Sequence, residues 1–208
     1  MRPWTEPIVE EIFQDFSVST DFAISIEKLQ EESYKMMELV NSANRSNVGG
    51  WQSPTWYDGD RLKEKPITEI FPEFTRLKYM IYDFATDVTH QLQVVGGRYH
   101  VHGGEWWVNK NTYQSYNNIH NHGRADLIGV FYIKSPKDSS CIKLARNDGS
   151  AYTKLYRDDL TTGYSQQMTY PPVEGKFYLF PGHLWHYVIP QSVEGDRISS
   201  SYNLYLKA

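Results

Sequence analysis

The sequence RISSSYNLYLK, residues 197–207, alternates side chains in the way a half-buried β-strand does. One face carries hydrogen-bonding groups: Arg197, Ser199, Ser201, Asn203 and Tyr205. The other face carries Ile198, Ser200, Tyr202, Leu204 and Leu206. Such a polar row is commonly the solvated side of an edge strand, but serine is an unusual choice there. Because a guanidinium fork with neighbouring hydroxyls matches a carboxylate, we favour a barrel interior that binds an anion.

Short strands separated by turn signals precede this segment. The residues that predict strands are 106–110, 127–134, 141–145, 176–180 and 184–189. Breaks rich in Pro, Gly, Asn and Asp divide them, and this spacing predicts an antiparallel sandwich or barrel. The polar stretch 146–175 is expected to form a lid over the substrate opening, because connections of that length are usually functional.

The first half of the chain predicts two helices. The first begins after Ser25, a plausible N-cap, and has a loose apolar face. Residues 41–60 are rich in Asn, Ser and Gly and predict a loop. The second helix begins at Pro72, carries a clear apolar stripe and ends at residues 96–97, which are two glycines.

Length and composition fit one globular domain, with 208 residues of which 40% are hydrophobic and 22% charged. We expect a single domain over residues 1–208, with helical support and loops in 1–97 and the barrel core in 98–208. Cys141 is the only cysteine, so an intramolecular disulfide is excluded.

Charge and hydropathy exclude two further classes of partner. The net charge is −4, which argues against nucleic acid as a partner. No apolar run is long enough to span a membrane, and the N-terminal residues lack an apolar signal region. A cytoplasmic protein is therefore expected.

Six of the seven histidines form close pairs, at 100 and 102, 120 and 122, and 183 and 186. Residues i and i+2 of a strand point to one face, so either His-x-His pair is able to place two imidazoles on one metal. Neutral imidazole suits Fe, Zn, Cu and Ni, so the pairs alone name no metal.

Three motifs in order give a more specific indication. They are HNHGRADLIGVFYI (120–133), FPGHLWH (180–186) and RISSSYN (197–203), and GGWQS (49–53) and WWVN (106–109) accompany them. Together they resemble the Fe(II)/2-oxoglutarate-dependent dioxygenase superfamily, and most closely a small oxygenase family known partly from phage genomes. The resemblance implies a mainly β fold: a double-stranded β-helix, or jelly-roll barrel of the cupin kind, with supporting N-terminal helices.

The resemblance also implies the ligands of an iron site. His120 and His186 take the positions of two histidine ligands, and His122 stands where the superfamily usually has a carboxylate. Asp126 is the alternative carboxylate, but its spacing does not match, so we expect His122. We read His183 as a non-ligand, and the pair at 100 and 102 as structural or substrate-side.

The cosubstrate site follows from the same resemblance. Arg197 is expected to bind the distal carboxylate of 2-oxoglutarate with Ser199 as its hydroxyl partner, and Tyr132 and Asn203 are expected to line the site. For Tyr132, plain core packing is an equally good interpretation.

The expected function is an iron(II)- and 2-oxoglutarate-dependent dioxygenase that hydroxylates a second substrate, a peptide or small molecule, using dioxygen. One alternative is a cupin-like three-histidine dioxygenase or isomerase that uses no 2-oxoglutarate. The other is a non-catalytic barrel that binds a partner. Because fold does not fix function, the enzyme prediction depends on the three histidines and Arg197.

Overall fold

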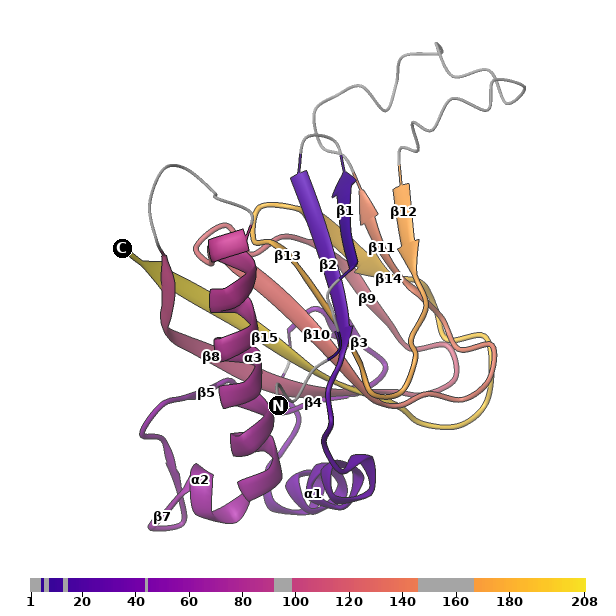
Figure 1. Cartoon of the computed structure of the whole chain (residues 1–208). Helices are drawn as coiled ribbons and strands as arrows, with labels where there is room; N and C mark the ends of the chain where they lie inside the picture. Colours follow the sequence, from indigo (N-terminus) through magenta and orange to yellow (C-terminus); the bar gives the residue numbers. More distant parts are fainter. Residues whose placement is uncertain (1–4, 6–7, 13–14, 44, 92–98, 146–166) are drawn as a thin grey trace, which may run out of the picture.

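The structure, a computed structural model, describes residues 5, 8–12, 15–43, 45–91, 99–145 and 167–208. It contains two facing antiparallel sheets and a helical layer that covers the outer side of the larger sheet (Figure 1). This is the mainly β architecture that the strand pattern predicts.

The larger sheet contains the central strands of the fold. Its strands follow the spatial order β1 (Ile8–Ile12), β2 (Asp15–Asp21), β13 (Lys176–Pro181), β10 (Leu127–Lys134), β15 (Arg197–Lys207), β8 (His100–Asn111) and β4 (Trp51–Gln52), and β5 (Trp56–Tyr57) also pairs with β8. All these pairings are antiparallel.

The smaller sheet lies opposite. Its order is β12 (Gln167–Tyr170), β11 (Ile142–Ala145), β14 (Trp185–Val188), β9 (Tyr116–His120) and β3 (Asn47–Val48). A separate hairpin joins β6 (Arg61–Leu62) to β7 (Lys65–Pro66).

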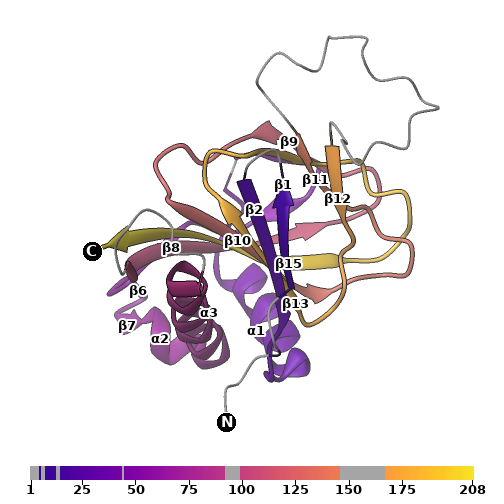
Figure 2. The ribbon, with the colours of Figure 1, turned by 45° about the horizontal axis from the view of Figure 1, so that its top comes forward.

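Three helices form the outer layer: α1 (Ile26–Leu39), α2 (Ile67–Ile70) and α3 (Pro72–Gln91). The Ser25 hydroxyl accepts a hydrogen bond from the backbone N–H of Lys28, so it is the N-cap that the sequence predicts. Both long helices lie on the side of the larger sheet that faces away from the smaller one (Figure 2). Among the described helices, none has the length and apolar character that a membrane crossing requires.

Strand β10 divides two hydrophobic cores, because both of its faces are buried. Leu127, Phe131 and Ile133 pack toward the helices, whereas Ile128 and Val130 pack toward the smaller sheet. A strand covered on both faces needs a continuous apolar run, and residues 127–133 supply one.

Strand β15 uses its two faces differently. Ile198, Tyr202 and Leu204 belong to the core under the helices. The alternate residues Arg197 and Ser199 are also buried, on the side of the smaller sheet. The polar face therefore points into the protein, as expected from its serines, which are unusual on the solvated face of a strand.

Several strands were not anticipated from the sequence. Residues 1–97 contribute β1 and β2 to the larger sheet, and the expected loop 41–60 contains β3, β4 and β5, of which β4 and β5 also join that sheet. Strand β12 lies in the stretch expected to be a lid, and β9 lies where the strand pattern gave no bounds. Strand β2 is polar in composition and is held by its pairing with β13, where Lys176 lies opposite Asp21. Of the expected lid, residues 146–166 lie outside the described part, as do residues 92–97 of the expected second helix.

Phe177 joins the layers, and its removal is expected to destabilise the fold. Its ring lies 5.5 Å from that of Phe22, 6.0 Å from that of Phe84 and 6.3 Å from that of Tyr202, and the side chain is fully buried. Phe177→Ala should lower the free energy of unfolding by about 3–5 kcal/mol. Urea unfolding followed by circular dichroism measures this. Val173→Ala, at an exposed position, is the control and should change the value by less than about 0.5 kcal/mol.

Candidate metal centre

Pairing between β14 and β9 brings two distant histidines together. The register places His186 directly opposite His120, and their ring centroids are 4.3 Å apart. Residues directly opposite in an antiparallel pair are close enough for their side chains to share one ligand. The strand pairing therefore brings together two histidines that are 66 positions apart in the sequence.

His122 joins the pair from the turn that follows β9. Its backbone N–H donates to the carbonyl of Gly182 at 2.8 Å, and its own carbonyl accepts from Ala125 at 2.8 Å. A side chain at Gly182 would place its Cβ 2.0 Å from the Ala125 carbonyl oxygen, so this close approach requires glycine. The His-x-His pair thus converges although His122 lies beyond the strand end, whereas the sequence argument placed both residues in one strand.

The three imidazoles form a group that is able to hold a metal ion. One ring nitrogen from each of His120, His122 and His186 lies within 4.8 Å of the others. Ring centroids are 5.0 Å apart for His120 and His122, and 5.0 Å for His122 and His186. The three histidine side chains therefore lie together on one side of the domain.

Two of the rings are oriented by main-chain carbonyls. Nδ1 of His120 lies 2.6 Å from the carbonyl oxygen of Asn118, and Nδ1 of His186 lies 3.0 Å from that of Leu184. A carbonyl only accepts, so Nδ1 carries the hydrogen and Nε2 keeps a free lone pair. Neutral imidazoles with a free Nε2 are the form that binds Fe(II).

Burial keeps the three rings neutral. It lowers the pKa of His120 and His186, and for His186 the neighbouring imidazoles add to the effect. Burial and the proximity of His120 lower the pKa of His122 to about 4. At neutral pH no proton therefore has to leave before a metal binds.

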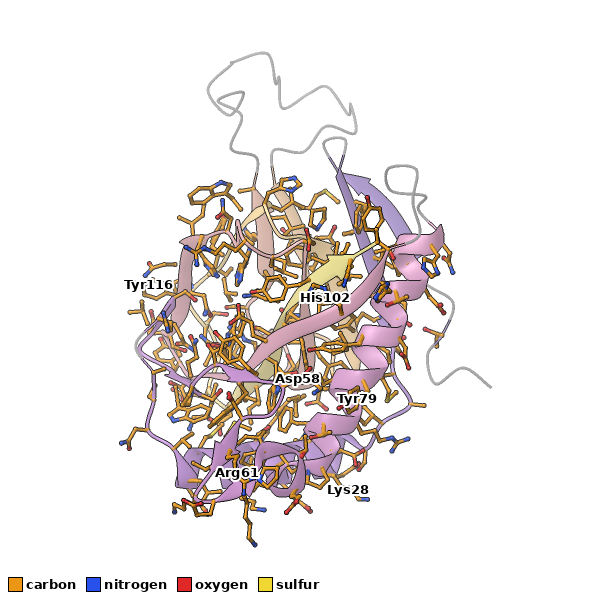
Figure 3. All side chains as sticks on the ribbon, turned by 90° about the vertical axis from the view of Figure 1, so that its left-hand side faces the viewer. Lys28, Asp58, Arg61, Tyr79, His102 and Tyr116 are labelled. Carbon is orange, nitrogen blue, oxygen red and sulfur yellow. The ribbon has the colours of Figure 1, made fainter. Side chains whose placement is uncertain are left out.

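The other candidate ligands lie elsewhere. Oδ2 of Asp126 accepts a hydrogen bond from the backbone N–H of Leu206 and is not part of the three-histidine group. His183 is exposed and also outside the group. His100 and His102 are exposed near the start of β8, and Figure 3 shows His102 beside α3, apart from Tyr116 of β9.

Arg197 lines the same inner pocket as the three histidines. Its side chain is 2% exposed, Nη1 donates to the carbonyl of Ser140, and Nε has no hydrogen-bond partner. Burial lowers its pKa, yet the group stays protonated because its ordinary pKa is so high. Within the described part of the chain, no carboxylate forms an ion pair with Arg197.

The remaining predicted residues divide between two pockets. Ser199 and Tyr132 lie opposite each other on β15 and β10 and both line the inner pocket. Burial raises the pKa of the Tyr132 phenol to about 12, so it is a neutral group there. Asn203 lines a wider outer pocket of about 470 Å³ instead, which the inner pocket of about 50 Å³ adjoins through His120 and His122.

Sequence reasoning missed the outer pocket wall. It includes Glu105 and Trp107 of β8, together with Gln52 and Tyr57 from short N-terminal strands. The Trp107 ring stacks on His122, with centroids 5.7 Å apart and planes 10° apart. The available signal was alternation along residues 105–109, which places Glu105, Trp107 and Asn109 on one face of β8.

Comparison with known proteins finds one matching family and several structures with a similar fold. Residues 105–203 match the family described as "Putative 2OG-Fe(II) oxygenase". This segment of the chain is therefore similar to 2OG-Fe(II) oxygenases. The matched segment runs from Glu105 to Asn203 and contains the three histidines and Arg197.

Solved structures share the fold of this chain at low sequence identity. A prolyl-4-hydroxylase from Pseudomonas putida has a TM-score of 0.52 and 12% identity, over 100% of this chain and 95% of that one. A prolyl hydroxylase from Trichoplax adhaerens, in complex with a hypoxia inducible factor peptide fragment, has a TM-score of 0.61 and 13% identity, over 99% and 84%. HygX from Streptomyces hygroscopicus, with nickel and 2-oxoglutarate bound, has a TM-score of 0.54 and 15% identity, over 90% and 82%. No curated protein sequence matches the chain.

The lowered pKa of His122 predicts that the stability of the metal-free protein depends on pH. In the unfolded chain this histidine titrates near 6.5, and in the folded protein near 4. Between these values the unfolded state binds more protons, so stability is complete above about pH 6.5 and is lost as the pH falls. By pH 5 the loss from His122 alone should be about 2 kcal/mol. Urea unfolding with a chelator present, at pH 8 and pH 5, should show a smaller difference for His122→Gln than for wild type; equal differences would contradict the assignment.

Proposed function

We propose that this protein is an oxygenase that binds iron(II) through His120, His122 and His186, and 2-oxoglutarate through Arg197 and Ser199. The observation that carries the proposal is the buried Arg197 guanidinium, which shares a pocket with three neutral imidazoles and has no carboxylate partner among the described residues.

A buried cation of this kind needs an anion. Desolvating a charge costs several kcal/mol unless a partner repays it, and Ser140 offers only one carbonyl to the guanidinium. The unpartnered Nε leaves one edge of the fork available to a bidentate carboxylate. The Ser199 hydroxyl on the same strand face is placed to complete that cradle. A dicarboxylate therefore fits the residues present.

The donor set also fits iron. His120, His122 and His186 would hold the metal through one ring nitrogen each, and three protein ligands would leave positions open for a cosubstrate and dioxygen. When bound, iron(II) supplies dioxygen activation coupled to decarboxylation of 2-oxoglutarate. One oxygen atom ends in succinate and the other in the hydroxylated substrate, with release of CO2.

The chain's own residues then have three tasks. Arg197 fixes the far carboxylate of the cosubstrate, which sets the position of its opposite end relative to the imidazoles. Apolar groups of β10 and β13, with Tyr132, enclose the inner pocket and exclude water. Because all three ligands are neutral, the metal charge is balanced by the anionic cosubstrate and not by a ligand carboxylate.

The second substrate is proposed to enter through the outer pocket, which borders His120 and His122. Its volume of about 470 Å³ suits a small molecule or a peptide side chain. Structural neighbours include one enzyme bound to a peptide fragment and one with hygromycin B, which supports leaving both classes within the proposal.

Arg197→Ala is the variant that tests the cosubstrate site. Removing one partner of a buried charged pair costs about 2–5 kcal/mol, so the affinity for 2-oxoglutarate should fall by roughly thirty-fold or more. Arg197→Lys should recover only part of the loss, because a point charge does not reproduce the fork. Calorimetric titration of 2-oxoglutarate into the Ni²⁺-loaded proteins measures both effects.

Two controls separate the alternatives. Ni²⁺ affinity should be nearly unchanged in Arg197→Ala, since no metal ligand is altered. Succinate formation by the Fe(II)-loaded wild type should require 2-oxoglutarate. Oxygen consumption that is independent of 2-oxoglutarate would favour a three-histidine dioxygenase instead, and failure of the wild type to bind any metal would favour a non-catalytic barrel.

A further inference from the structure

The His122 ring lacks the main-chain support that the other two imidazoles have. His120 and His186 each direct Nδ1 at a carbonyl two residues earlier in the chain. Within the described part of the chain, no main-chain carbonyl accepts a hydrogen bond from the His122 ring. Trp107 stacks on the ring face, but stacking does not choose which ring nitrogen carries the hydrogen.

Asn203 lines the outer pocket together with His122, and the two side chains interact. Burial lowers the pKa of His122 most, followed by His120, while an interaction with the Asn203 side chain acts in the opposite direction. The Asn203 Oδ1 atom is buried and has no hydrogen-bond partner among the described residues, so an acceptor is available to the imidazole that lines the same pocket.

Glu105 fixes which way the Asn203 amide points. The two residues lie directly opposite each other on β15 and β8, and Nδ2 of Asn203 donates to Oε1 of Glu105 at 2.7 Å. A carboxylate only accepts, so the amide nitrogen has to face Glu105 and the amide oxygen has to face away. The orientation of Asn203 is thus set by a charge, not by packing.

Glu105 is itself held in the ionised form. Burial acts to raise the pKa of Glu105. Hydrogen bonds from Asn203, Tyr57 and Tyr205, together with the nearby His122, lower this pKa by more than burial raises it, so the net pKa is below the usual range. The Tyr205 hydroxyl lies 2.8 Å from the same Oε1 atom. The negative charge is therefore present at neutral pH and borders the metal side of the outer pocket.

We propose that Glu105 is a positioning residue that acts through Asn203 to fix the orientation of the His122 ring. Glu105 also brings a negative charge close to the three histidines, in place of the charge that a carboxylate ligand would bring. This inference rests on the proposed function of His122 as a ligand. Outer groups of this kind, which orient a ligating imidazole, change metal affinity by roughly 10–100-fold when they are removed.

Calorimetric titration with Ni²⁺ tests the proposal. Glu105→Gln and Asn203→Ala should each weaken Ni²⁺ binding by about 10–100-fold. The double variant Glu105→Gln with Asn203→Asp moves the carboxylate next to His122 and gives it an amide donor, so it should recover most of the affinity. Tyr205→Phe removes another donor to the same Glu105 oxygen without touching His122, and should change the affinity by less than about three-fold.

A second measurement needs no metal. Nitrogen-15 chemical shifts of the ring nitrogens distinguish the two tautomers of His122. The metal-free wild type should show one tautomer, whereas Asn203→Ala should show a mixture of both. Thermal unfolding by circular dichroism confirms that each variant is folded before it is compared.

The outcomes separate the two proposals. If His186→Ala abolishes Ni²⁺ binding while Glu105→Gln and Asn203→Ala bind as tightly as wild type with an unchanged tautomer, the role of Glu105 is wrong and the metal site stands. If His186→Ala binds Ni²⁺ as wild type does, the metal site itself is wrong, and the inference about Glu105 falls with it.

Discussion

Strand β15 has two buried faces of opposite chemistry, and the rest of the fold is arranged to satisfy both. Its apolar face, with Tyr202 and Leu204, is covered by the helices. Its polar face, with Arg197 and Ser199, has to be enclosed without being left unpaired. The smaller sheet encloses that face, and the three histidines lie in the pocket between the sheets. Site and fold are consequences of one alternating strand.

The sequence predicted the elements whose pattern is strong and local. Residues 127–134 and 197–207 have the predicted strand bounds, and α1 begins at its predicted cap. Strands β1 and β2 were missed because they depend on pairing, β1 with β2 and the polar β2 with β13, and a local pattern does not contain such contacts. Strand β9 is also polar and depends on its pairing with β14 and β3.

The order of the sequence motifs predicted the site residues that lie within those motifs, and no others. The three histidines converge and Arg197 is buried beside them, in keeping with the resemblance. Asn203 instead borders the outer pocket, and Glu105 was not singled out at all. Glu105 matters through its cross-strand position opposite Asn203, which depends on the register between β15 and β8. Register is a property of the whole sheet, so no single segment reveals it.

The short strands β4 and β5 both pair with β8, and this places a segment from outside the matched family region against the site. Gln52 and Tyr57 on that segment form part of the outer pocket wall, whereas the imidazoles and Arg197 come from the matched region. Under the proposed function, part of the wall that would meet a second substrate therefore comes from a stretch of the chain that holds neither the metal nor the cosubstrate. Changes in that stretch would alter substrate choice while leaving the residues of the oxidative chemistry in place, so one barrel would serve several substrates in the course of divergence.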